Sequence, residues 1–198
     1  MTTITIPAKF GYPKFDMYIN GKKYTLQSGV EITVEDHVAE VIEKALALAP
    51  KYSKNLSKLA QLAEGTITEL TASDLEGIDK IYYYVFGQCY SLLRVEIPDS
   101  VTQIVKSAFT SCTSLECVRF GKDSKIDSIG ESAFYFCGKL SRVYLPPKPP
   151  TLENANAFSD INKSCVFYCK SQESLNAYKA AANWSTLTGT YAFTVESK

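Results

Sequence analysis

The segment SAFTSCTSLECVRF, residues 107–120, decides the fold because the chain contains it in three related copies. The copy before it is YVFGQCYSLLRVEI, residues 84–97, and the copy after it is SAFYFCGKLSRVYL, residues 132–145. Matched residues lie 23 positions apart between the first two copies and 25 positions apart between the last two. A period of this length predicts a solenoid in which each copy forms one coil.

Four positions of the repeat carry the same residue in all three copies: Ile, Phe, Cys and Leu. We expect these side chains to form the core of the solenoid. They are Ile81, Phe86, Cys89 and Leu92; Ile104, Phe109, Cys112 and Leu115; and Ile129, Phe134, Cys137 and Leu140. The three cysteines share one register, so we expect free thiols packed as small apolar groups and not disulfide partners.

Each copy predicts one strand and one turn of helix. Alternation at its end predicts a short strand with Val95 and Ile97 inward and Arg94 and Glu96 outward. The Ser-Ala-Phe half has the three-to-four spacing of a helical turn that places one aromatic ring in the core. A single coil buries too little apolar surface to be stable alone, so the coils must stack and both ends need caps.

The sequence predicts that the chain has three parts: residues 1–64, the repeat region 65–150, and residues 151–198. In the first part, alternation around Asn20-Gly21 predicts a β-hairpin, and the capping-box pattern Thr33 to Asp36 predicts a helix that stops at Pro50. A second helix is expected from about Ser53. We interpret this part as a docking or oligomerisation module, and residues 65–150 as an incomplete first coil followed by the three copies.

Residues 151–198 predict a C-terminal cap. Ala157-Phe158 repeats the Ala-Phe pair, Val166 to Tyr168 predicts a strand, and Ser171 is expected to cap a helix. That helix would carry Leu175, Tyr178 and Ala182, with Trp184 closing the open end and Tyr191, Phe193 and Val195 alternating in a last strand.

The repeated motif, with the ending AFSDINKSCVFYCKSQESLNAYKAAANWSTL, resembles the BspA-type (treponemal) leucine-rich repeat over roughly Ile67 to Val195. The resemblance implies an α/β fold, namely a short leucine-rich-repeat solenoid with a C-terminal cap, preceded here by a small β-hairpin and helix module. It also implies a surface-displayed binding or adhesion protein without enzymatic activity. It names no ligand.

Composition argues against several classes of protein. Acidic and basic residues balance at 21 each, which leaves no basic footprint for nucleic acid. No apolar stretch is long enough for membrane insertion, and Met1 to Phe10 lacks the pattern of a secretory signal. The single histidine, His37, together with the cysteine spacings, predicts no catalytic residues, no metal site and no cofactor.

The repeat register projects five side chains onto the outer face of the strands as candidate ligand-binding residues: Arg94, Glu96, Arg119, Arg142 and Tyr144, with Cys117 between Arg94 and Arg142. Arg, Glu and Tyr combine directional hydrogen bonds with aromatic contact, as recognition surfaces require. The alternative is that they are ordinary solvated strand residues. A second candidate is the tyrosine cluster Tyr82–Tyr84 with Tyr90, for which core or cap packing is the competing interpretation.

Residues 18–50, YINGKKYTLQSGVEITVEDHVAEVIEKALALAP, resemble short N-terminal segments of phage head-fibre and related virion proteins. This resemblance leads to one hypothesis: a virion-surface protein whose residues 1–64 bind capsid or associate with other copies of this chain as a homotrimer. Its solenoid would bind protein or glycan on a host or mucosal surface. The alternative is a bacterial BspA-type adhesin, at the cell surface or secreted.

Overall fold

The computed structural model describes residues 1–5, 15–19, 22–26, 31–36, 38–39 and 68–197. The chain divides into two compact units, Met1–Ala60 and Gln61–Lys198, and each is described by itself.

The first unit contains two antiparallel strand pairs. Strand β2 (Phe15–Ile19) pairs with β3 (Lys22–Leu26), with Ile19 opposite Lys22, which confirms the predicted hairpin. Its connection, Asn20-Gly21, lies outside the described residues. Strand β1 (Thr2–Thr5) pairs with β4 (Glu31–Val34).

The predicted capping box at Thr33 is wrong. Thr33 lies inside β4 opposite Thr3, and helical backbone starts only at Asp36. The Asp36 carboxylate accepts a hydrogen bond of 2.6 Å from the Thr2 hydroxyl, so it ties the strand pair to the helix start. The expected continuation of this helix and the helix after Ser53 lie outside the described residues.

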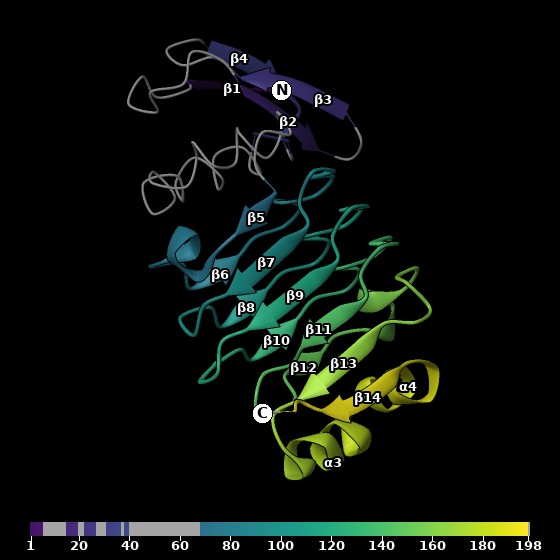
Figure 1. The fold of residues 1–198 in the computed structure, drawn as a ribbon. Coiled ribbons are helices and arrows are strands. Elements are labelled where there is room, and N and C mark those ends of the chain that lie inside the picture. Colours follow the sequence, from purple (N-terminus) through teal and green to yellow (C-terminus); the bar gives the residue numbers. More distant parts are fainter. Residues whose placement is uncertain (6–14, 20–21, 27–30, 37, 40–67, 198) are drawn as a thin grey trace. The chain divides into compact units, whose positions relative to one another are not determined.

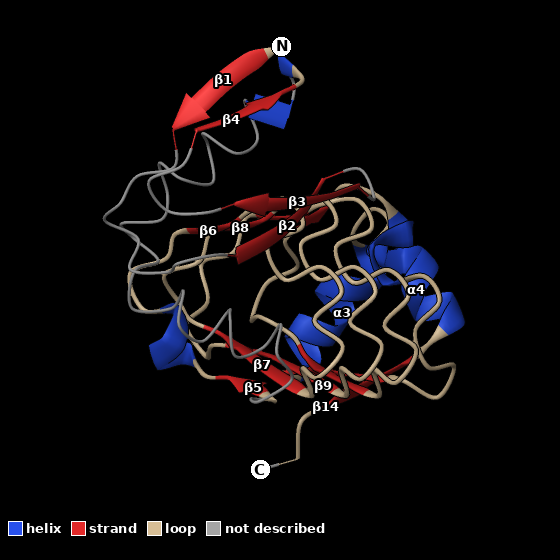
Figure 2. Ribbon diagram, turned by 90° about the horizontal axis from the view of Figure 1, so that it is seen from above, coloured by secondary structure: helices blue, strands red, loops and turns tan. Residues whose placement is uncertain are grey.

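The second unit is a solenoid with two parallel sheets (Figure 1). The larger has, in order, β5 (Glu69–Leu70), β7 (Arg94–Ile97), β9 (Cys117–Phe120), β11 (Arg142–Tyr144), β13 (Val166–Cys169) and β14 (Ala192–Val195). The smaller has β6 (Lys80–Ile81), β8 (Gln103–Ile104), β10 (Ser128–Ile129) and β12 (Thr151–Leu152). Figure 2, which looks down the stack, shows the two sheets on opposite sides of the coils.

The core contains every predicted repeat residue, from Ile81 to Leu140, and each is buried. The rings of Phe86, Phe109, Phe134 and Phe158 stack in one column, with centroids 5.0 to 5.1 Å apart. Offset stacking of this kind adds to the energy of burial. The repeat therefore places one aromatic ring per coil directly over the last.

The cysteines are free thiols, as predicted. The Cys112 thiol donates to the Phe86 carbonyl at 3.0 Å, and the Cys137 thiol donates to the Phe109 carbonyl at 3.3 Å. Burial raises the pKa of Cys89 to about 12. Cys112 and Cys137 thus each link their coil to the one before it, and the raised pKa of Cys89 disfavours its thiolate.

The predicted helical turn at Ser-Ala-Phe, or at Tyr-Val-Phe in the first copy, is wrong in all three copies. This part is a series of turns in which two non-glycine residues per coil have left-handed backbone: Tyr84 and Gln88, Ser107 and Ser111, Ser132 and Phe136. Only in the following coil does the Ala-Phe pair lie in helix, the 3-10 helix η3 (Ala155–Phe158).

The turns form a third wall with its own hydrogen-bond ladder. The Phe109 N–H donates to the Ala133 carbonyl at 2.8 Å, and the Ser111 N–H donates to the Tyr135 carbonyl at 2.8 Å. Matching bonds join the coils before and after. The left-handed residues direct these N–H groups at the next coil, so the backbone of this wall is satisfied without strands.

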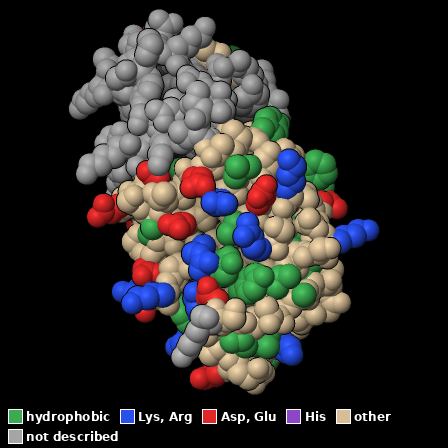
Figure 3. All heavy atoms as spheres, viewed as in Figure 1, with side chains coloured by type: hydrophobic (Ala, Val, Ile, Leu, Met, Phe, Trp, Pro, Cys, Tyr) green, Lys and Arg blue, Asp and Glu red, His purple; other side chains and the backbone are tan. Residues whose placement is uncertain are grey.

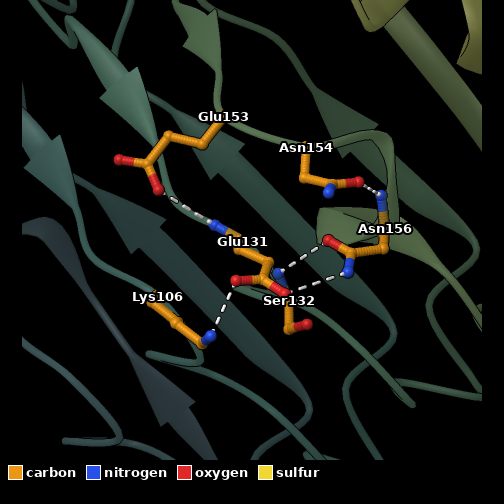
Figure 4. A network of polar contacts seen from close by, with 6 residues as sticks. All are labelled: Lys106, Glu131, Ser132, Glu153, Asn154 and Asn156. Atoms are coloured by element: carbon orange, nitrogen blue, oxygen red, sulfur yellow. Dashed lines mark hydrogen bonds and ion pairs between the residues drawn. The ribbon is translucent and has the colours of Figure 1, made fainter.

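Side chains reinforce this wall, as Figure 4 shows. Lys106 and Glu131, on successive coils, form an ion pair of 2.7 Å, which raises the lysine pKa and lowers the carboxyl pKa. Asn156 of the next coil accepts from the Ser132 N–H at 3.2 Å, and Glu153 accepts from the Glu131 N–H at 3.2 Å.

Both ends of the stack are capped. At the start, β5 and the 3-10 helix η2 (Ala72–Leu75) bury Leu70 and Leu75 against the first full coil. Of the expected first-coil residues, Ile67 lies outside the described part of the chain.

At the other end, α3 (Gln172–Ala180) and α4 (Trp184–Thr190) close the core. Ser171 caps α3, as predicted, by accepting from the Ser174 N–H at 3.1 Å. The buried Trp184 indole donates to the Pro150 carbonyl at 2.7 Å, and the Tyr178 hydroxyl donates to the Pro146 carbonyl at 3.1 Å. Ala182 lies beyond the end of α3 and is exposed, so its predicted place on the helix is wrong.

Candidate functional site: the outer face of the six-stranded sheet

The sheet register places the predicted outer residues in two rows. Arg94, Cys117 and Arg142 are cross-strand neighbours in the first row, and Glu96, Arg119 and Tyr144 in the second. The structure extends the rows to Val166 and Ala192, and to Tyr168 and Thr194. The projected register is therefore confirmed, while the ligand-binding role of these side chains stays a prediction.

A stack of three side chains occupies the second row. The Arg119 guanidinium lies 3.5 Å from the Tyr144 ring centroid, and the Tyr144 and Tyr168 rings stack with centroids 4.7 Å apart. All three side chains are half-buried. Cation–π contact and ring stacking fix their rotamers, so this row presents a preformed surface.

Glu196, just after β14, anchors one end of this stack. Its carboxylate oxygens lie 3.0 Å from the Arg119 guanidinium and 3.1 Å from the Lys170 ammonium. Burial alone would raise the carboxyl pKa, but the hydrogen bonds from Arg119 and Lys170 outweigh it and the pKa is lowered. Arg119 is thus engaged within the chain and is less available to a ligand than the sequence suggests.

The other charged residues of the face differ in their partners. Arg94 forms an exposed ion pair of 3.0 Å with Glu69, and Glu96 accepts from the Ala72 N–H at 3.5 Å. For the Arg142 guanidinium, by contrast, the described residues supply neither an ion pair nor a hydrogen bond. Figure 3 looks onto this face and shows charges of both signs beside a hydrophobic area. An unpaired guanidinium next to stacked tyrosines is a recognition feature.

Cys117 lies between Arg94 and Arg142 and is the half-exposed cysteine of the chain, whereas the other five are buried. Burial raises its pKa, although the charges of Arg142, Arg119 and Arg94 lower it in part. The thiol therefore reports on access to the sheet face and is not activated for chemistry.

Sequence reasoning missed Tyr168, Lys170 and Glu196. Tyr168 could have been found, because the strand Val166 to Tyr168 was predicted and needed only to be aligned with the third copy. No local pattern signals Glu196, which lies 77 residues from its partner Arg119.

The predicted tyrosine cluster lies on the third wall, away from this face. Tyr83 and Tyr90 are exposed, and Tyr82 and Tyr84 are half-buried. Core or cap packing is therefore wrong for Tyr83 and Tyr90.

The described residues contain no group of three or more His, Cys, Asp or Glu side chains placed to hold a metal ion. They include a shallow hollow of about 210 Å³, lined by Pro149 to Leu152 and by Ala181 and Ala182. His37 lies outside the described residues. None of the described helices is both long and apolar enough to cross a membrane.

A stack of parallel coils with one rigid sheet face defines the class: a repeat solenoid used as a binding scaffold. The model of the BspA type leucine rich repeat region matches residues 63–193 in six copies, so the chain belongs to this family. The family resemblance and the fold class expected from the sequence are thus confirmed. No curated protein matches the chain.

Two solved structures are similar. A leucine-rich repeat protein of T. pallidum is 23% identical, with a TM-score of 0.30 over 52% of this chain and 52% of that one. A leucine-rich cell surface protein of Faecalibacterium prausnitzii is 21% identical, with a TM-score of 0.28 over 52% of this chain and 34% of that one. The chain thus aligns with about half and one third of these proteins. Neither comparison supports the virion, capsid or head-fibre hypothesis.

Proposed function

We propose that this chain is a non-enzymatic binding protein of bacterial adhesin type, displayed at the cell surface or secreted, which recognises a protein through the outer face of its six-stranded sheet. Membership of the BspA type family supports the class of function. The observation that carries the choice of face is the stack of Arg119, Tyr144 and Tyr168 beside the unpaired Arg142.

The chemistry of the face favours a partner with acidic and apolar groups close together. Arg142 supplies a planar donor for a carboxylate, and the tyrosine rings supply rigid apolar area beside it. Tyrosine and arginine side chains dominate the binding energy of many protein interfaces. Because the stack is already ordered, little side-chain entropy is lost on binding.

The division of the chain is part of the proposal. Residues 65–150 supply the recognition face and residues 151–198 cap it, completing the face with β13 and β14. Residues 1–64 act as a separate docking or oligomerisation module. Binding of this module to a capsid, and its association into a homotrimer, stay predictions from the sequence alone.

The test uses the full chain against purified extracellular-matrix proteins and mucin, each immobilised for surface plasmon resonance. We expect saturable binding to at least one of them, weakened about tenfold or more in Arg142→Ala and in Tyr168→Ala. Lys139→Ala is the matched control, because Lys139 is exposed and lies outside the strands of the six-stranded sheet. Loss of binding in the control but not in the two variants would contradict the choice of face.

A further inference from the structure

A second surface of the solenoid carries an unusual pattern of aromatic side chains. Besides Met1, the large hydrophobic side chains that the described residues expose all lie on the third wall. They are Tyr83, Tyr90, Tyr135 and Phe136, exposed by 40%, 55%, 39% and 52%. Isolated exposed aromatics are ordinary, but their gathering on one wall indicates a binding surface.

The rings form two clusters on alternate coils. In the first, Tyr83 and Tyr84 have centroids 5.9 Å apart with planes inclined by 38°, and Tyr90 lies near Tyr84. In the second, Tyr135 and Phe136 have centroids 6.1 Å apart with planes inclined by 37°. The two clusters therefore present nearly the same arrangement of paired rings.

The clusters lie in one column along the stack. The Tyr84 ring covers Gly87, where an added Cβ would lie 2.7 Å from the ring atoms. Gly87 is the repeat counterpart of Tyr135, so the Tyr84 ring occupies on the first coil the place of Tyr135 on the third. Coils separated by strand spacing lie about 5 Å apart, which puts the two clusters about 10 Å apart.

The coil between the clusters is polar. Thr110, the counterpart of Tyr135 on the second coil, is buried, and its hydroxyl donates to the Tyr135 carbonyl at 3.4 Å. The hydroxyls that this coil offers are those of the half-buried Ser107, Ser111 and Thr113 in the same series of turns. Lys106, the repeat counterpart of Tyr83, also lies on this coil and pairs with Glu131 on the third. The wall thus alternates aromatic, hydroxyl-bearing and aromatic along the stack.

The aromatic clusters are preorganised by the backbone. Tyr84 and Phe136 have left-handed φ angles of 58° and 59°, and the Phe136 N–H donates to the Ser159 carbonyl at 3.0 Å. A binding surface fixed in advance loses little entropy when a ligand binds.

We propose that this wall binds an extended oligosaccharide of β-1,4-linked hexopyranose units. Sugar rings present C–H faces that stack on aromatic rings and hydroxyl rims that need hydrogen bonds. In an extended chain of this type every second sugar presents the same face, which matches rings on the first and third coils and hydroxyls on the second. A protein interface would favour one continuous apolar centre, whereas here a polar coil divides it.

The test measures binding of cellohexaose and chitohexaose to the full chain by isothermal titration calorimetry. We expect saturable binding of at least one of them, and binding of its disaccharide at least about tenfold weaker, because a disaccharide cannot contact both clusters. Tyr83→Ala and Tyr135→Ala, one in each cluster, should each weaken hexasaccharide binding about tenfold. Circular dichroism and the melting temperature check that both variants are folded.

Tyr144→Ala is the matched control, since it removes a tyrosine from the sheet face and should leave oligosaccharide binding unchanged. Absence of binding to both hexasaccharides would overturn the proposal. Equal binding by the wild type and by both cluster variants would also overturn it. Neither result would affect the protein-binding role of the sheet face, which is tested with other ligands and other variants.

Discussion

At the scale of single residues, Arg119 shows where the repeat register reaches its limit. The register places it correctly on the outer face, next to Tyr144. It cannot show that the guanidinium binds Glu196, because that contact joins the second repeat to the last strand, 77 residues away. Arg119 therefore orders the sheet face, and Arg142 is the arginine that this face leaves unpaired.

Arg119→Ala should lower the free energy of unfolding by about 1 kcal/mol at neutral pH, because it removes a cation–π contact and a partly buried ion pair. The loss exceeds that expected of a solvated strand residue. Urea unfolding of both proteins measures it. Lys139→Ala, at an exposed position, should change the free energy of unfolding by less than about 0.5 kcal/mol.

The Glu196 ion pairs should make part of this difference pH-dependent. Folding lowers the Glu196 pKa, so the pairs stabilise the folded chain above the ordinary carboxyl pKa of 4.5. That contribution disappears as the pH falls through the lowered pKa. The stability difference between wild type and Arg119→Ala should therefore shrink on acidification below pH 4.5. A difference that is constant with pH would show that the cation–π contact alone is responsible.

Phe109→Ala should cost about 3 to 5 kcal/mol, because it leaves a cavity between two stacked rings in the middle of the core. Chemical denaturation measures the cost. Phe136→Ala is the comparison, since its ring is 52% exposed and its removal should cost less than about 0.5 kcal/mol. Similar losses in the two variants would mean that the phenylalanine column does not carry the core.

At the scale of elements, the third wall explains why a helical turn was predicted in error. The spacing of Ile104, Phe109 and Cys112 matches one face of a helix. Left-handed backbone is usually signalled by glycine or asparagine, but here serine, glutamine and aromatic residues adopt it. Hydrogen bonds to the next coil determine the conformation, and no local pattern in the sequence reveals them.

Ser111 gives a direct test of this wall, with a φ angle of 59°. Ser111→Val should lower stability by about 1 to 2 kcal/mol, because a β-branched side chain resists left-handed backbone. Ser111→Gly should change it by less than about 1 kcal/mol, because relief of strain opposes the added freedom of the unfolded chain. Thermal unfolding monitored by circular dichroism compares them. Valine and glycine variants of equal stability would contradict the assigned backbone.

At the scale of the whole molecule, the repeat period predicted the solenoid, the buried residues and the rows of the sheet face, because stacking forces equivalent residues into register. The C-terminal cap was predicted in outline, from Ser171 and Trp184. Inside the repeats the period did not predict the left-handed turns. Outside them it could not predict the pairing of β1 with β4 or the second cap helix α4. The repeat period does not identify the ligand either, because outward-facing residues do not have to pack against the next coil.

Cys117 allows the central claim, an exposed sheet face at the bacterial surface, to be measured directly. It is the half-exposed cysteine on that face, and the other five are buried. Intact source cells are treated with a membrane-impermeant maleimide at mildly alkaline pH, which offsets the raised thiol pKa. A Cys117→Ser variant is the control, and labelling of lysed cells shows the total available thiol.

The account predicts labelling of the wild-type chain on intact cells or in the culture medium, and no labelling of Cys117→Ser. Labelling that appears only after lysis, or that follows released particles instead of the cell envelope and medium, would contradict a surface-displayed or secreted binding protein.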